Sequence, residues 1–298
     1  MLLKDIIRNR YIYLMLLPVV VYYIIFSYLP MYGAQIAFKS FSPVNGIWGS
    51  TWIGLQHFEA FFQGIYFWRT FRNTLLISLY DILFGFPAPI LLALLLNELR
   101  SLKYKRLVQS FTYMPHFISV IVVVGIMVDF LTRDGLVNLV LADLGLEKIA
   151  FLQSPEWFRG LYIGSGIWQQ VGWGSIIFIA AIAGIDPTLY EAARVDGAGR
   201  FRQVMHITLP GIMPTIIILL ILRLGNVMNV GYEKILLMYN PMVYETADVI
   251  STYVYRKGIL DASFDYSSAV GLFNSVINLV LLVIANYTSR RVNGSGLW

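Results

Sequence analysis

The chain has 298 residues, of which 58% are hydrophobic and 13% charged, and its mean hydropathy is +0.68. A soluble domain carries about a quarter charged residues, so this composition excludes an ordinary soluble protein and predicts a bundle of membrane helices. The absence of Cys excludes a disulfide framework and thiolate metal sites, and the basic residues form short clusters between apolar stretches, not the continuous patch typical of nucleic-acid binding.

Six stretches are long and apolar enough to cross a bilayer as helices, because a hydrocarbon core needs about 20 residues whose backbone groups bond within the segment. The first is longer than a signal peptide and lacks a small-residue cleavage site, so we expect a retained helix. The sequence thus predicts an all-α, polytopic membrane protein with one transmembrane domain over residues 1–298. The expected spans are 11–29, 73–96, 107–131, 161–185, 208–230 and 269–287, the last five forming a core over about 73–287.

The segment between the first two spans is rich in aromatic residues. Such residues favour the headgroup level of a membrane, so we interpret 55–68 as an interfacial amphipathic piece, with an ordinary folded cap as the alternative. Further along, Pro87, Pro89 and Pro115 predict kinks in the second and third spans.

The distribution of basic residues predicts the orientation. With six spans both termini lie on one side, and the segments on that side hold 12 Lys and Arg in 53 residues, against 9 in 110 residues on the other side. By the positive-inside rule the denser side is cytoplasmic. These segments are 1–10, 97–106, 186–207 and 288–298.

The cytoplasmic loop before the fifth span reads as helix, turn, helix. Asp186 can cap a helix with Pro187 at its first position, or Thr188 can form a capping box with Glu191. Gly197 suits the left-handed position that ends a helix. Helix then resumes at 200–207, and we expect Pro210 to open the fifth span.

This loop resembles the EAA loop of the permease subunits of type I ATP-binding-cassette importers. The motif is Glu-Ala-Ala, three residues, Gly, nine residues, Ile, one residue, Leu-Pro, and its spacing is met throughout. The matching residues are Glu191, Ala192, Ala193, Gly197, Ile207, Leu209 and Pro210.

Other stretches are similar to the carbohydrate-uptake branch of that family. These are Trp52-Ile53-Gly54-Leu55 with Phe58, Arg72-Asn73-Thr74-Leu75, and Ala93-Leu94-Leu95-Leu96-Asn97. Three more resemble its complex-polysaccharide subgroup: Pro30-Met31-Tyr32-Gly33, Phe84-Gly85-Phe86-Pro87-Ala88-Pro89 and Gly296-Leu297-Trp298.

The resemblance implies a multi-pass permease of the bacterial inner membrane, with the loop over about 186–207 as a coupling helix that seats in a cytoplasmic ATPase. The implied partners are two ATPase subunits, a second homologous permease that packs on the first span, an extracytoplasmic solute-binding protein, an oligosaccharide and membrane lipid, but no nucleic acid. The sequence has no Walker loop, so we expect no enzymatic activity, cofactor or metal in this chain, with ATP and Mg bound by the ATPases.

Polar residues inside the spans are candidates for the sugar path, because such residues usually face a bundle interior or a water-filled cavity. In maltose-type permeases, sugar-contacting residues occupy windows that hold Trp168, Gln169, Asn226 and Asn229 here. The alternative is that the amides join helices by hydrogen bonds. The candidates are Trp168, Gln169, Trp173, Arg223, Asn226, Asn229, Asn274 and Asn278.

Arg223 suggests the kind of sugar. If the fifth span is helical through residue 230, Arg223, Asn226 and Asn229 fall within about 120° of arc. A guanidinium on that arc suits a uronate carboxylate, and so favours an acidic oligosaccharide. Alternatively, the side chain snorkels to the headgroups.

Other classes remain as alternatives. A permease for amino acids or phosphate would have a similar loop. An ion-coupled carrier would use Asp81 or Asp129 but has no ATPase to dock. A membrane enzyme, such as a polyprenyl-sugar transferase, needs clustered carboxylates or His, whereas His57, His116 and His206 lie in separate segments.

Overall fold

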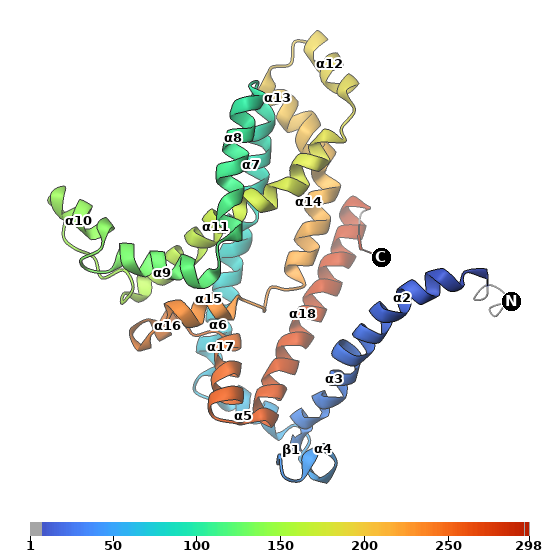
Figure 1. Cartoon of the computed structure of the whole chain (residues 1–298), viewed down its shortest axis with the longest axis vertical. Coiled ribbons are helices and arrows are strands. Elements are labelled where there is room, and N and C mark those ends of the chain that lie inside the picture. Colours follow the sequence, from blue (N-terminus) through green and yellow to red (C-terminus); the bar gives the residue numbers. More distant parts are fainter. Residues whose placement is uncertain (1–7, 295, 298) are drawn as a thin grey trace. The chain divides into compact units, whose positions relative to one another are not determined.

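The computed structural model describes residues 8–294, 296 and 297, and nearly all regular structure among them is helical (Figure 1). Lys4, which entered the charge count, and Trp298 of the C-terminal motif lie outside the described residues. The chain divides into two compact units. The smaller unit comprises Met1–Gly64 with Val254–Phe273, and the larger unit comprises Ile65–Tyr253 with Asn274–Trp298.

The smaller unit begins with a candidate membrane span over Arg10–Phe38, whose most apolar window has no buried residue. After it, a two-stranded antiparallel ladder pairs Lys39 with Trp52. Asp265 anchors the chain after the first strand, because its Oδ2 accepts from the Phe41 N–H at 3.0 Å. The elements that begin in this unit are α2 (Arg10–Tyr23), α3 (Leu29–Met31), β1 (Lys39–Ser40), α4 (Gly46–Gly49), β2 (Thr51–Trp52), α5 (Gln56–Gln63) and α18 (Phe264–Asn293).

The larger unit is a helical bundle with two apolar clusters. One surrounds Ile235 and Val249, and the other surrounds Phe178 and Ile212. The helices are α6 (Phe67–Tyr80), α7 (Pro87–Glu98), α8 (Leu102–Tyr113), α9 (Val120–Leu131), α10 (Leu136–Asp143), α11 (Pro155–Ala183), α12 (Pro187–Val195), α13 (Arg200–Gln203), α14 (Leu209–Leu224), α15 (Tyr232–Met238), α16 (Tyr244–Ala247), α17 (Ile250–Tyr255) and the end of α18.

The polytopic all-α fold is confirmed. Within the described residues, five helices are long and apolar enough to cross a membrane, and a sixth span is possible if one bent pair counts as a single span. The unbent helices are Arg10–Phe38, Phe67–Glu98, Pro155–Ala183, Arg200–Leu224 and Phe264–Arg291.

The predicted third span is the exception, because it is not a single helix. The chain bends by 99° between Leu102–Phe117 and Val120–Asp143. Pro115 lies in the short 3-10 turn before the break, and Ser119 then starts α9 as its N-cap with an extended backbone. Proline removes a backbone donor and Ser is a favoured cap, so the sequence there ends one helix and starts another.

Three prolines inside spans each follow a π-helical turn by two residues. Pro30 follows Ile24–Tyr28, Pro87 follows Asp81–Gly85, and Pro210 follows Val204–Thr208. The wider turn accommodates a ring that would clash with the preceding turn of an ordinary helix. Pro210 is thus the second residue of α14, but the helix does not start there, because it runs on continuously from Arg200.

Candidate functional site

The loop proposed for coupling begins with α12, and its N-terminus has the first of the two predicted caps, Asp186 with Pro187. Asp186 is the N-cap, its Oδ1 accepts from the Thr188 N–H at 2.9 Å, and Pro187 takes the first helical position. This hydrogen bond to the charged form lowers the pKa of the Asp186 carboxyl. A negative charge at this position also complements the helix dipole.

The same helix ends in a Schellman motif. The Ala198 N–H donates to the Ala193 carbonyl oxygen at 2.8 Å, and the Gly197 N–H donates to that of Arg194 at 3.1 Å. Gly197 has φ +74°, as its sequence context predicted. The turn therefore fixes where α12 stops, and the chain reverses into α13.

One contact holds α12 and another holds the start of α13 against the rest of the larger unit. The Tyr190 hydroxyl is hydrogen-bonded to Thr208 Oγ1 at 2.9 Å, and Arg200 pairs with Glu98 at the end of α7 at 3.6 Å. Thr208 is buried. A displacement of α12 would therefore be transmitted to the helix that contains α14.

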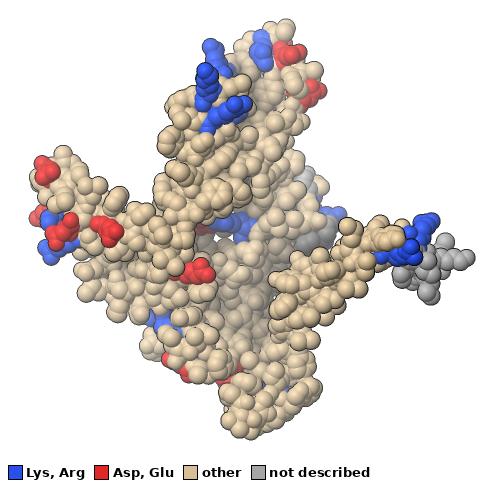
Figure 2. All heavy atoms as spheres, viewed as in Figure 1, with Lys and Arg blue, Asp and Glu red and all other residues tan. Residues whose placement is uncertain are grey.

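The outer face of the loop exposes a mixed surface. Glu191 and Ala192 of the motif are exposed, whereas Ala193 and Ile207 are partly buried. Sequence reasoning missed three apolar side chains beside them, although large apolar residues between charged ones in a loop are a visible signal. They are Leu189, Val195 and Phe201, of which Val195 is 87% exposed. Lys and Arg gather over α8 and α13 at the same end of the larger unit (Figure 2).

A second site lies within the helices of the larger unit, where two hollows share Asp81, Tyr162, Arg223 and Gly231. They have volumes of about 210 and 400 Å³. We call them together the central cavity. Residues predicted for the sugar path that line it are Gln169, Trp173, Arg223, Asn226 and Asn229.

Arg223 forms an ion pair with another residue that lines the cavity, Asp81. Its Nε donates to Asp81 Oδ2 at 2.8 Å, and its Nη2 contacts the same oxygen. The Arg223 side chain is 52% exposed and that of Asp81 is 32% exposed. Asp81 is therefore a counter-ion to Arg223 in this structure.

The helical arc predicted for Arg223, Asn226 and Asn229 was wrong, because α14 ends at Leu224 and residues 225–230 are not helical. These residues still line one cavity because the irregular chain wraps its wall. Buried polar side chains satisfy its backbone: Asn278 Oδ1 accepts from the Met228 N–H at 2.9 Å, and Ser78 Oγ donates to the Val227 carbonyl. Non-helical backbone at membrane depth needs such partners.

The remaining candidates lie around this wall. Asn274 donates to Asn229 Oδ1 at 2.9 Å, whereas Asn278 is buried and bound to backbone. Gln169 donates to the Ile118 carbonyl oxygen at the break before α9, at 2.8 Å. Trp168 is 48% exposed and does not line the cavity.

Trp173 adds an aromatic wall. Its ring stacks in parallel on His116 with 4.4 Å between centroids, and His116 Nδ1 is hydrogen-bonded to Gln170 Oε1 at 2.9 Å. His116 thus has a positioning role beside the cavity. Among the described residues no group of His, Asp and Glu is arranged to hold a metal ion.

Sequence reasoning also missed Lys234, since it lies in a segment assigned to an extracytoplasmic loop. It is 8% exposed on α15 and lines the central cavity. Its Nζ donates to the Tyr162 carbonyl oxygen at 3.0 Å and lies 4.9 Å from the centroid of the Tyr162 ring. The signal was a cation that directly precedes an apolar run, Ile235 to Met238.

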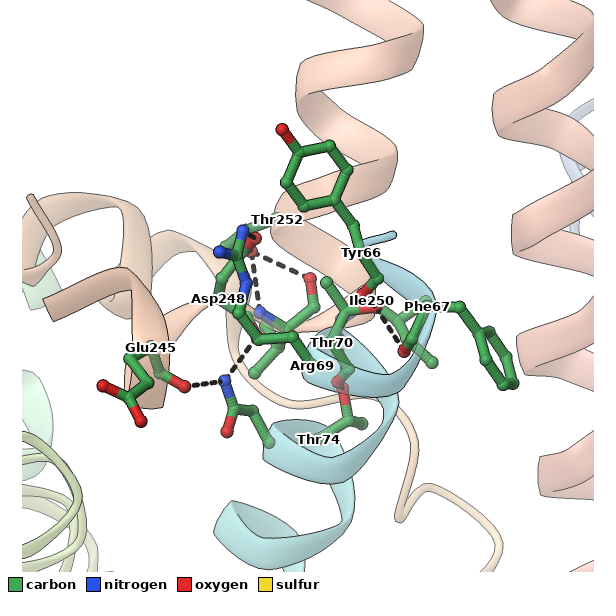
Figure 3. Close-up of polar contacts among 11 residues, drawn as sticks. Tyr66, Phe67, Arg69, Thr70, Thr74, Glu245, Asp248, Ile250 and Thr252 are labelled. Carbon is green, nitrogen blue, oxygen red and sulfur yellow. Dashed lines mark hydrogen bonds and ion pairs between the residues drawn. The ribbon is translucent and has the colours of Figure 1, made fainter. Parts of the chain in front are cut away.

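A buried polar network ties α6 to the segment around α16 and α17 (Figure 3). Asp248 is fully buried, its Oδ2 accepts from Arg69 at 2.9 Å, and its Oδ1 accepts from Thr252 at 2.9 Å. Thr74 Oγ1 accepts from the Ile250 N–H at 3.0 Å, and Asn73 Nδ2 donates to the Asp248 carbonyl at 3.0 Å. The network therefore fixes the chain that follows α15 and, with it, the wall that carries Lys234.

Comparisons with known proteins agree on one class. The model of the family described as "binding-protein-dependent transport system inner membrane component" matches residues 85–294. Protein LplB of Bacillus subtilis is 48% identical over 98% of this chain and 92% of its own length. The polygalacturonan/rhamnogalacturonan transport system permease protein YteP of the same organism is 45% identical over 100% of this chain and 93% of its own length.

Two crystal structures are similar over nearly the whole chain. One is of a bacterial ABC transporter involved in the import of the acidic polysaccharide alginate, with a TM-score of 0.92 and 49% identity over 98% of this chain and 99% of that one. The other is of a bacterial alginate ABC transporter in complex with an alginate pentasaccharide-bound periplasmic protein, with a TM-score of 0.92 and 48% identity over 99% of both chains.

Proposed function

The chain belongs to the family of inner membrane components of binding-protein-dependent transport systems, and we propose that it is one transmembrane half of an importer that takes up acidic oligosaccharides. The observation that carries the proposal is the central cavity, whose lining joins the amides of Gln169, Asn226 and Asn229 to an aromatic wall and two cations. Amides both donate to and accept from sugar hydroxyls, and aromatic faces pack on sugar C–H groups.

The acidic class is supported by charge. Among the described residues that line the 400 Å³ hollow, Arg223 and Lys234 are positively charged and Asp81 is negatively charged. The lining therefore has one excess positive charge. Two similar proteins are named for the transport of polygalacturonan and of alginate, which are uronic-acid polymers. A neutral sugar gains nothing from such a charge, whereas a uronate is stabilised by it.

The proposed partners follow from the coupling loop. In this proposal α12 seats in a cytoplasmic ATPase through Glu191, Ala192 and the exposed apolar side chains of Leu189, Val195 and Phe201. The ATPases bind ATP and Mg and hydrolyse the nucleotide, while this chain supplies the path. A second permease packs beside the exposed span Arg10–Phe38, and a solute-binding protein delivers the sugar from outside.

The test is reconstitution with the second permease, the ATPases and the solute-binding protein. We expect a galacturonate trimer to stimulate ATP hydrolysis several-fold above the rate with empty binding protein, and to do so more strongly than its uncharged methyl ester. Trp173 lines the cavity, and Trp173→Ala should lower the stimulated rate of ATP hydrolysis about tenfold. Trp157 packs on Phe151 outside the cavity, and Trp157→Ala should leave that rate unchanged. Absence of stimulation by either sugar would refute the proposed function.

A further inference from the structure

Lys234 is a buried ammonium without a carboxylate partner among the described residues. Within the described part of the chain, its Nζ contacts the Tyr162 carbonyl oxygen and the Tyr162 ring. An ammonium has three donors, and burying one costs free energy unless it is paired. Burial lowers the pKa of Lys234 to about 8, a shift that Asp81 opposes, so the group is still mostly charged at neutral pH.

Arg223 differs, because its charge is already compensated. Two of its nitrogens contact Asp81 Oδ2. A sugar carboxylate that bound Arg223 would have to displace Asp81, which is attached to the same cavity wall and so competes at a high effective concentration. A carboxylate that bound Lys234 would displace one backbone carbonyl contact. Lys234 also lines the same 400 Å³ hollow as Gln169 and Trp173.

We propose that Lys234 is the residue that binds a sugar carboxylate in the central cavity, and that Asp81 neutralises Arg223 so that this ammonium carries the excess charge of the lining. The inference rests on the proposed function and assigns its specificity to one residue. With a single excess positive charge, the cavity attracts one uronate carboxylate of the oligosaccharide. The other carboxylates of the same oligosaccharide find no unpaired cation among the described lining residues. Binding remains weak enough for release, as translocation requires.

The test compares uptake of the galacturonate trimer with uptake of its methyl ester in proteoliposomes at concentrations below saturation. The binding protein is the same for every variant, so its own preference cancels when each variant is divided by the wild type. We expect the ratio of acidic to neutral uptake to fall about tenfold or more in Lys234→Met, because a charge-assisted hydrogen bond is lost. Lys234→Arg should restore most of the ratio.

The matched control is Lys148→Met, which removes an extracytoplasmic lysine that pairs with Asp134 away from the cavity. Its ratio should equal that of the wild type. Assembly of each variant is checked by co-purification with the second permease and the ATPases, and Lys234→Gln provides a polar substitute if the Met variant does not assemble. An unchanged ratio in assembled Lys234→Met or Lys234→Gln would overturn the proposal.

A double variant separates the two cations. Asp81→Asn with Arg223→Gln removes the ion pair but leaves the net charge of the lining at plus one, so the acidic preference should persist. Arg223→Gln alone should lose it, because Asp81 then opposes Lys234. Loss of preference in the double variant would assign the carboxylate to Arg223 and overturn the role given to Lys234. If the wild type itself shows no acidic preference, the acidic class in the proposed function fails instead.

Discussion

Gly197 limits the coupling loop through its backbone alone. Its φ of +74° lies in the left-handed region, and an added Cβ would meet no atom within 4 Å. Any cost of a substitution is therefore conformational and not steric crowding by neighbours. Gly199, two residues on, has φ −68° and equally open space, so the two glycines make a matched pair.

We predict that Gly197→Val weakens docking to the ATPase. A β-branched residue in this region costs about 1–3 kcal/mol, which the helix can avoid by unwinding its last turn and moving Val195. Co-purification with the ATPase and sugar-stimulated ATP hydrolysis should fall in Gly197→Val and persist in Gly199→Val. Equal behaviour of the two variants would argue against a role for this backbone conformation.

The packing of α8 on α11 depends on a close approach at Gly172. A Cβ at this position would lie 2.0 Å from the Thr112 carbonyl oxygen. Gln169 and Trp173 lie beside this contact on the same helix. Gln169 donates to the Ile118 carbonyl oxygen at the break before α9, and Trp173 lines the central cavity. This element pair therefore holds both the bend and one wall of the cavity.

Gly172→Ala should force the two helices apart and destabilise the protein by about 1–3 kcal/mol, as overpacking does. A Cβ at Gly164 on the same helix would meet no described atom within 4 Å beyond its chain neighbours and the adjacent helix backbone. Gly164→Ala should therefore be neutral or stabilising, because Ala favours helix over Gly. The fraction of monodisperse protein that survives heating in detergent measures both. A Gly172→Ala variant as resistant as wild type would contradict this close approach.

At the scale of the whole molecule, the charge distribution predicts which side faces the cytoplasm. Cations gather at the end of the larger unit that carries α8 and α13 (Figure 2), and the same end bears the coupling helix. We predict from both features that this end lies in the cytoplasm, one through the positive-inside rule and the other through the proposed docking of α12 to an ATPase.

Cysteine labelling tests this orientation, and the chain has no native Cys to give background. Arg194→Cys on α12 should react with an impermeant maleimide in inside-out vesicles, whereas Asp143→Cys at the end of α10 should react in right-side-out vesicles. Both positions are exposed in the chain. The reverse pattern would invert the topology.

The sequence by itself determined the class and the local structure of the loop that contains α12. A bilayer core holds no water, so the backbone of each of the six apolar stretches must satisfy its own hydrogen bonds as a helix. These hydrogen bonds join residues that are close together in the chain. The ends of α12 are equally local, since Asp186 and Gly197 act within four residues of themselves. Such features can be read without knowledge of distant contacts.

Only the tertiary structure decided what the cavity contains. Asp81 and Arg223 are 142 residues apart, and no local pattern indicates that they pair. The end of α14 at Leu224 depends on Asn278 and Ser78, which satisfy the freed backbone from other helices. Lys234 lines the cavity because α15 packs close enough for its Nζ to donate to Tyr162 on α11, 72 residues earlier in the chain. Electrostatic partners and hydrogen bonds to irregular backbone are set by the packing of distant segments, and sequence periodicity carries no record of them.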